Sequence, residues 1–256
     1  MKILVCVKGV CDPAEYEKKE PADETELDGL ALRLNRFDEY AVEEAIRIRE
    51  QIEKTRVYVL SAGPPETISV IRRAIGMGAD SGIYIDLDGG PLFSPETTAA
   101  VIAKAAAGKN YDLIITGAMS EDRMSRQTGR MIAAFLGYPC ATSVIYESID
   151  PETKTITVKQ EHQGGRRTLL KLDLPAVITV QTGINTPRYP SLSRMLAAKE
   201  AEIEIISSKD VRCEGPASRI IGLSDPRQSR AGIVLSGSTK EKAKALVKHL
   251  KRKAIL

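Results

Sequence analysis

The chain has 256 residues, of which 43% are hydrophobic and 28% charged, and its formal net charge is +3. This length and composition are typical of a globular protein that buries a full core, either as one α/β domain with an appendage or as two small domains. No run of about 18 apolar residues and no signal leader is recognisable, which argues against membrane insertion and leads us to expect a cytoplasmic protein.

The charge is distributed unevenly. Residues 238–256 contain seven Lys or Arg and a single acid, Glu241, so the remainder carries 30 basic and 33 acidic residues. A basic tail could bind nucleic acid. However, three Phe, no Trp and an acidic body lack the aromatic platform on which bases stack, so no nucleic-acid partner is predicted.

The cysteines do not follow the spacing of a metal site. No CxxC pair occurs, and only His162 and His249 could join the thiols as ligands, so zinc and iron–sulfur patterns are missing. We interpret the four residues as buried or incidental thiols: Cys6, Cys11, Cys140 and Cys213.

The first half alternates between strand and helix patterns. Apolar runs predict strands at residues 1–7, 56–60, 82–86 and 111–116. Helical spacing predicts a helix capped by Asn35 or Asp38, and further helices at 66–77, 95–107 and 126–136, the last beginning near Ser125 or Arg126. Residues 8–34 are expected to form a long surface excursion, and 61–65 a tight turn. This alternation predicts a doubly wound, Rossmann-like parallel α/β sheet with right-handed crossovers.

The alternation of strand and helix patterns stops in the second half. A β-meander is predicted at residues 143–148, 155–160 and 166–172. Another central strand is predicted at 176–180 and a short helix at 192–199. An extended arm is predicted at residues 207–237. It is followed by a final basic helix, which we expect Ser238 or Thr239 to cap. We therefore expect a nucleotide-binding domain at 1–206, with the meander at 143–173 and a loop at 187–199, and an arm with its helix at 207–256.

One stretch carries the layout of an anion site. The strand at 111–116 leads through Gly117 and a polar loop into a helix start. Backbone N–H groups and the side chains of Ser125, Arg126, Gln127 and Thr128 could converge there on a phosphate. An ordinary strand-to-helix connection is the alternative, because Ser and Thr commonly cap helices.

The usual catalytic and nucleotide motifs are missing. No GxxxxGK followed by Ser or Thr and no GxSxG occurs, and Gly76 with Gly78 lacks the third glycine of a dinucleotide fingerprint. The segments 6–10, 61–64 and 117–128 nevertheless follow strands whose carboxyl ends meet where the strand order reverses. Together with Asn35 they could surround an adenine nucleotide. Asp122 could accept a hydrogen bond from a ribose hydroxyl, or cap its own loop.

Several motifs resemble a known family when taken together and in order. They cover most of the chain, and those from Leu174 and Asn185 are the most specific. The motifs are KILVCVKGVCD, LNRFDEYAVEEAIRIRE, VLSAGPPE, AIGMGAD, DLIITGAMSEDRMSRQTG, LPAVITV and NTPRYPSLSRMLAAKEAEI. The sequence thereby resembles the β subunit of electron transfer flavoproteins.

The resemblance implies an electron carrier without catalytic residues of its own. It implies a heterodimer with an α subunit that carries FAD and passes electrons from acyl-CoA dehydrogenases or similar enzymes, as in fatty acid β-oxidation, to a quinone reductase or another acceptor. The β subunit would hold AMP as a structural nucleotide. The AMP contacts implied by position are Cys6, Asn35, Ala62, Asp122, Arg126, Gln127 and Thr128, with Gly117 and Gly129 shaping the loop.

The resemblance also implies two further roles. Phe37 corresponds to an aromatic residue near the flavin of the α subunit. The loop that anchors partner dehydrogenases corresponds to 189–196, with Leu192 as its plug beside Tyr189, Met195 and Leu196. The C-terminal arm would pack on the α subunit.

Two alternatives stay open. Arg126 stands where AMP-type members usually have Asn, and an arginine there could grip a diphosphate. The chain could therefore belong to a bifurcating flavoprotein that binds a second FAD and oxidises NADH, although Gln127, Thr128, Gly129 and Arg130 are closer to the AMP type. The other alternative is a free-standing adenine-nucleotide sensor or hydrolase.

Overall fold

A computed structural model of the chain describes residues 1–11, 32–87, 94–211 and 232–255. The chain divides into two compact units, Met1–Ile220 and Ile221–Leu256. The strands are β1 (Lys2–Cys6), β2 (Gly9–Cys11), β3 (Leu32–Leu34), β4 (Arg56–Gly63), β5 (Ser81–Asp86), β6 (Leu113–Gly117), β7 (Cys140–Asp150), β8 (Thr155–Glu161), β9 (Arg167–Asp173), β10 (Ala176–Val180) and β11 (Ile203–Ser207). The helices are α2 (Arg36–Gln51), α3 (Ile68–Met77), α4 (Pro95–Ala106), α5 (Thr128–Leu136), α6 (Leu192–Glu200) and α7 (Thr239–Arg252), with short 3₁₀ turns η1 (Pro65–Thr67) and η2 (Gln163–Gly165).

The first unit is built on a nine-stranded sheet in the order β11-β5-β4-β1-β6-β10-β7-β8-β9. The pairs from β11 to β7 are parallel, and β8 and β9 add antiparallel strands at one edge. The chain progresses outward from β1 through β4 and β5, then returns to place β6 on the other side of β1. The predicted doubly wound, Rossmann-like α/β fold is confirmed, and its switch point lies between β1 and β6.

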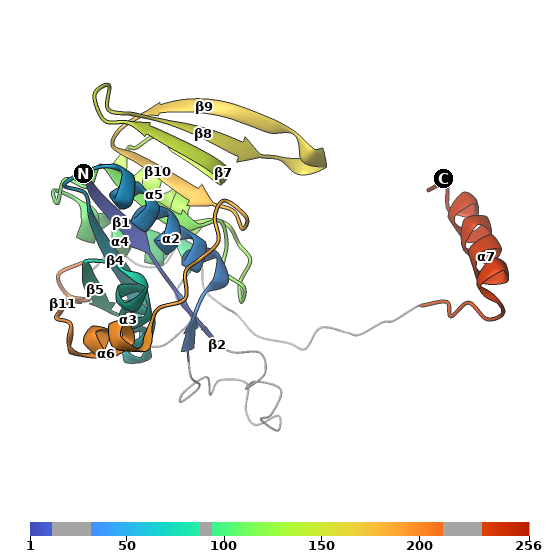
Figure 1. Ribbon diagram of the computed structural model, residues 1–256, viewed down its shortest axis with the longest axis horizontal. Helices are drawn as coiled ribbons and strands as arrows, with labels where there is room; N and C mark the ends of the chain where they lie inside the picture. The colour runs from blue at the N-terminus through green and yellow to red at the C-terminus, as the bar shows by residue number, and fades with distance from the viewer. Residues whose placement is uncertain (12–31, 88–93, 212–231, 256) are drawn as a thin grey trace. The chain divides into compact units, whose positions relative to one another are not determined.

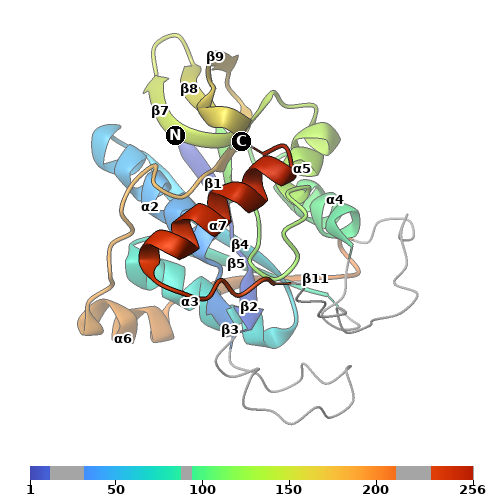
Figure 2. The same ribbon diagram turned by 90° about the vertical axis from the view of Figure 1, so that its right-hand side faces the viewer.

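Helices cover both faces of the parallel strands, with α2 and α3 on one side and α4 and α5 on the other (Figures 1 and 2). Each side has its own apolar cluster, because successive strand residues point to opposite faces. Ile3 and Val5 of β1 face the α2 side, whereas Leu4 faces the α4 side. Strand β10 is buried along its whole length, which explains its continuous apolar run.

The meander extends the main sheet. Strand β7 begins at Cys140 and pairs with β10, so the hairpins continue the parallel sheet at its edge. Ile156 and Val158 of β8 are fully buried in the cluster that includes α2. Glu147 of β7 lies beside Glu44 of α2. Burial and the neighbouring Glu44 carboxylate raise the pKa of Glu147 to about 8, so the Glu147 carboxyl can hold its proton at neutral pH.

Several predicted boundaries are wrong. The excursion expected at 8–34 contains β2 and β3, which pair antiparallel, while residues 12–31 lie outside the described part of the chain. Ser61, Ala62 and Gly63 belong to β4 and not to a turn, since they pair with β5. Helix α5 begins at Thr128 and not near Ser125, because Arg126 has a left-handed backbone with a φ of 57°.

The sequence interpretation missed β11, which pairs in parallel with β5 at the other edge of the sheet. Its alternating apolar residues lie between a helix and the region read as an arm. Ile205 is 68% exposed there, so part of the strand's apolar pattern faces solvent and no buried run marks the strand in the sequence. Of the expected arm, 208–211 and 232–237 lack regular structure, and 212–231 lie outside the described residues.

The second unit contains the predicted basic helix, α7. Ser238 and Glu241 form a reciprocal capping box at its start, and basic residues occupy its last turn, where they complement the helix dipole. Its apolar side includes Leu246 and Val247, which are 49% and 44% exposed. Local chemistry therefore accounts for the helix itself.

A glycine in β5 tests the packing of α3 on the sheet. A Cβ built on Gly82 would lie 2.5 Å from Cγ2 of Ile71 and 3.2 Å from Cδ1 of Ile75. We expect Gly82→Ala to lower the free energy of unfolding by about 1–3 kcal/mol through overpacking. Urea unfolding measures this, with Gly232→Ala as control because a Cβ built there meets no atom of the described residues within 4 Å apart from its chain neighbours. Equal stability of both variants would contradict the packing described.

Candidate nucleotide site

A cavity of about 910 Å³ lies at the carboxyl ends of the parallel strands, next to the switch point. The wall of the cavity includes the segments after β1, β4 and β6, the end of β10 and the start of α5. The sequence-predicted residues that line it are Cys6, Asn35, Ala62, Gly117, Asp122, Arg126, Gln127, Thr128 and Gly129. All nine predicted nucleotide residues therefore meet at one cavity, although they come from distant parts of the sequence.

Two of these glycines are required by close packing. A Cβ on Gly117 would lie 2.3 Å from Oδ1 of Asp38 and 2.7 Å from Cβ of Phe37. A Cβ on Gly129 would lie 2.6 Å from Oγ1 of Thr116 and 2.7 Å from the Thr179 methyl group. Gly117 thus lets α2 approach the end of β6, and Gly129 lets α5 start directly against β6 and β10.

Asn35 holds the loop after β6. It occupies the N-cap position of α2 but makes no side-chain cap, which corrects the predicted capping role. Its Nδ2 donates to the carbonyl oxygen of Met119 at 3.0 Å, and its Oδ1 accepts from the backbone N–H of Glu121 at 3.1 Å. Because the side chain is almost fully buried, these two bonds fix the loop against α2.

Asp122 is paired within the protein. Its carboxylate forms an ion pair with Lys8 and also accepts from the backbone N–H of Arg123 at 2.7 Å. Partial burial raises its pKa, but the hydrogen bonds from Lys8 and Ser120 outweigh burial and lower the pKa below its usual value. Asp122 thus holds its own loop, and it remains at the cavity wall where a ribose could reach it.

Lys8 is a cavity residue whose ion pair the sequence did not reveal. It follows the first buried strand by two positions, at the predicted ligand-binding edge, and that position is the signal that could have identified it. Arg33 adds a second cation, which pairs with Glu121 at 3.0 Å. Both cations connect the loop after β6 to the segments around β2 and β3.

Asp38 joins the ends of β1 and β6. Its two carboxylate oxygens accept from the backbone N–H of Lys8 at 2.9 Å and of Gly117 at 3.1 Å. The side chain is buried, and desolvation raises its pKa to about 7, although hydrogen bonds from Asn35, Lys8 and Gly117 oppose the rise. Asp38 therefore bridges the two strands at the switch point.

Among the described residues, no side chain caps the start of α5, and its first residues Thr128 and Gly129 line the cavity. Arg126 is exposed beside them, and its Nε donates to the sulfur of Met119 at 3.4 Å. Uncapped N–H groups at a helix start, with a guanidinium nearby, make this end of the cavity suited to a phosphate.

The remaining predicted residues lie elsewhere. Phe37 is buried next to Gly117 and does not line the cavity. Tyr189, Leu192 and Leu196 are 86%, 76% and 53% exposed, so they form an apolar surface of the segment around α6. Met195 differs from them, because its sulfur packs over Gly76 of α3.

The other expected features concern metals, thiols and membranes. The described residues contain no group of three potential metal ligands, and within them no helix is long and apolar enough to cross a bilayer. Cys6 is buried, which raises its pKa, and Cys11 and Cys140 are partly buried. Cys213 lies outside the described residues.

Fold and cavity define an open α/β protein with a cavity next to its switch point, the class in which nucleotides bind beyond the carboxyl ends of the strands. The sequence model of the electron transfer flavoprotein domain matches residues 3–211. The chain is 36% identical over 239 residues to the mitochondrial electron transfer flavoprotein subunit beta of Arabidopsis thaliana, with 92% of this chain and 94% of that protein covered. Identity to the same subunit of Bos taurus and of Homo sapiens is 35% over 238 residues, covering 91% of this chain and 92% of each relative. The chain therefore belongs to the electron transfer flavoprotein family, among its beta subunits.

The pKa of Asp38 predicts a pH dependence of stability. A folded pKa of about 7 lies above the ordinary value of 3.8. The protonated carboxyl therefore stabilises the fold fully below pH 3.8, and this stabilisation is lost as the pH rises through about 7. Between pH 5 and 7, we expect the wild type to lose stability relative to Asp38→Asn by up to about 1.4 kcal/mol per pH unit.

Urea unfolding of both proteins at several pH values measures this difference. Asp210→Asn, at an exposed position in the same unit, serves as the control. A difference between the wild type and Asp38→Asn that does not change with pH would contradict the assignment.

Proposed function

We propose that the chain is the β subunit of a heterodimeric electron transfer flavoprotein that holds AMP as a structural nucleotide. FAD on the α subunit would carry the electrons. The observation that supports this proposal is the convergence of nine residues from four separate segments on one cavity with an uncapped helix start. The volume of about 910 Å³ is sufficient for a nucleotide.

The residues present suit the parts of AMP. The first N–H groups of α5 and the guanidinium of Arg126 would bind the phosphate. Cys6 and Ala62 offer small, partly apolar surfaces for the base, and the Lys8–Asp122 pair can exchange one of its bonds for a ribose hydroxyl. The chain contributes position and charge here and carries out no bond-making step.

FAD, when bound, supplies the redox chemistry. This chain would orient it through the surface near Phe37 and bring a dehydrogenase close through the exposed apolar residues Tyr189, Leu192 and Leu196. An acyl-CoA dehydrogenase or a similar enzyme would donate electrons, as in fatty acid β-oxidation. A quinone reductase or another acceptor would receive them. The arm ending in α7 would pack on the α subunit through its half-exposed apolar side.

A second FAD in the cavity is the competing function. The exposed Arg126 could bind a diphosphate, and the cavity volume is near the upper end of the range of small-molecule sites, about 300–1,000 Å³. Such a protein would oxidise NADH and bifurcate electrons. A free-standing adenine-nucleotide sensor would need the cavity but no α subunit.

The cytoplasmic location remains a prediction. The Arabidopsis thaliana relative is named as mitochondrial, and that name describes only that protein. Fractionation of the source cells, followed by immunodetection of the chain, would determine its compartment.

Nucleotide content tests the proposed function. Protein purified with its α subunit and denatured should release about one AMP and one FAD per heterodimer, because under this proposal the cavity holds one mononucleotide with its phosphate at α5. Chromatography of the extract measures both. Two FAD and no AMP would establish the bifurcating alternative. A stable protein that holds a nucleotide and associates with no α subunit would instead support the sensor.

Deletion of residues 238–256 tests the arm. Removing α7 should weaken binding of the α subunit at least about tenfold, equivalent to 1.4 kcal/mol, because its apolar side loses its partner. Light scattering during dilution of the heterodimer measures dissociation. Lys240→Gln, which keeps the apolar side, should behave as wild type. Unchanged dissociation of the deletion variant would contradict the role of the arm.

A further inference from the structure

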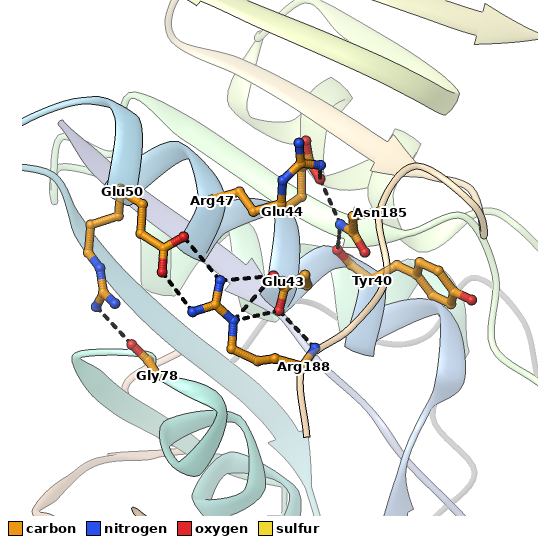
Figure 3. Close-up of polar contacts among 9 residues, drawn as sticks. Tyr40, Glu43, Glu44, Arg47, Glu50, Gly78, Asn185 and Arg188 are labelled. Carbon is orange, nitrogen blue, oxygen red and sulfur yellow. Dashed lines mark hydrogen bonds and ion pairs between the residues drawn. The ribbon is translucent and has the colours of Figure 1, made fainter. Parts of the chain in front are cut away.

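We propose that Arg188 is the positioning residue of the docking segment, defined as residues 185–200, and holds it in its binding conformation before any partner arrives. This inference rests on the proposed docking function. It concerns how the conformation of this segment is held, and not the contacts that its exposed apolar side chains would make. Figure 3 shows Arg188 between two carboxylates of α2, with Asn185 nearby.

The guanidinium of Arg188 uses all three of its nitrogens. Nε lies 2.9 Å from Oε2 of Glu43, and Nη2 lies 2.9 Å from Oε1 of the same residue. Nη1 and Nη2 donate to Glu50 at 2.7 and 3.1 Å. The backbone N–H of Arg188 also donates to Glu43, at 3.0 Å. Side chain and backbone of one residue are thus fixed to one helix (Figure 3).

Burial makes this arrangement strong. Glu43 is only 4% exposed, so its charge is shielded from water and depends on Arg188 for compensation. Hydrogen bonds to Glu50 and, as the second-largest cause, to Glu43 raise the pKa of Arg188 above its usual range. The hydrogen bond from Arg188 in turn lowers the pKa of Glu50. The fork geometry that satisfies both carboxylates is available to arginine and not to lysine.

Arg188 lies at the beginning of the exposed surface. Tyr189 follows it directly, with the guanidinium of Arg73 4.7 Å from its ring centre, and Ser191 caps α6 just before Leu192. Helix α6 has nine residues and buries only Ala198. Such a short helix with so little core is not stable alone, so contacts outside it determine its conformation.

Weaker contacts assist at either side. Nδ2 of Asn185 donates to the carbonyl oxygen of Tyr40 at 2.9 Å and to Glu44 at 2.6 Å. Nη1 of Arg72 donates to the carbonyl oxygen of Ala198 at 2.6 Å, and it also bonds the carbonyl of Lys199 at the end of α6. The docking segment is therefore tied to α2 before its apolar side chains and to α3 after them.

Fixing these side chains in advance lowers the entropy lost when a partner binds. Tyr189, Leu192 and Leu196 would otherwise sample many positions while exposed to water. We expect loss of Arg188 to weaken docking while leaving the electron-transfer step within the docked complex unchanged.

The first test is hydrogen–deuterium exchange of the purified heterodimer. In Arg188→Gln, amides of residues 189–200 should exchange at least about tenfold faster, while amides of the loop 117–129 stay unchanged. Arg49→Gln is the matched control, because Arg49 is a residue of α2 whose guanidinium pairs with Asp80 at 2.8 Å, outside the docking segment. Unchanged exchange in 189–200 would overturn the inference.

The second test is kinetic. With an acyl-CoA dehydrogenase that reduces the wild-type heterodimer, the KM for the heterodimer should rise about tenfold in Arg188→Gln, with kcat within about twofold. Arg188→Lys should be intermediate, and Glu50→Gln should give a smaller rise. Flavin and nucleotide contents equal to wild type confirm that the variants are assembled.

Leu192→Ala separates failure of this inference from failure of the proposed function. A raised KM for Leu192→Ala with an unchanged KM for Arg188→Gln would overturn the positioning role alone. An unchanged KM for Leu192→Ala would overturn the docking function, and with it the inference that depends on it.

Discussion

Helix α2 buries three carboxylates, and the arrangement of the first unit depends on how they are satisfied. Asp38, Glu43 and Glu44 are each at most 5% exposed. A buried charge is very costly unless it is paired or hydrogen-bonded, so each carboxylate needs partners. Asp38 accepts hydrogen bonds at the ends of β1 and β6, Glu43 pairs with Arg188, and Glu44 bonds Asn185 and Arg47. One helix thus holds the switch point and the docking segment together.

This arrangement links the two surfaces on which the proposed function depends. The start of α2 contacts the cavity through Asn35 and Asp38, and Glu43 and Glu50 hold Arg188 about one to three turns after Asp38. An α-helix is stiff on this scale, so the distance between cavity and docking segment is set by α2.

Both small residues and ion pairs shape the cavity. Gly117 and Gly129 allow α2 and α5 to approach the strands closely, and the uncapped start of α5 then faces the cavity. Lys8 with Asp122 and Arg33 with Glu121 fasten the loop after β6 from the opposite side. The loop is therefore positioned before a ligand is present, which reduces the ordering cost of binding.

The amino-acid sequence was sufficient to predict the alternating strands and helices apart from β2, β3 and β11, the parallel sheet, the switch point and the segments around the cavity, and the family resemblance then named the individual residues. Apolar periodicity and the carboxyl-end rule are local or topological, so they can be read from one chain. Tertiary structure alone decided the start of α5 after the left-handed Arg126, the pairing of β11, and the partners of Asp38, Lys8 and Arg188. These depend on residues up to 145 positions apart, and a charge pattern along the chain cannot say which distant partner will satisfy a buried group.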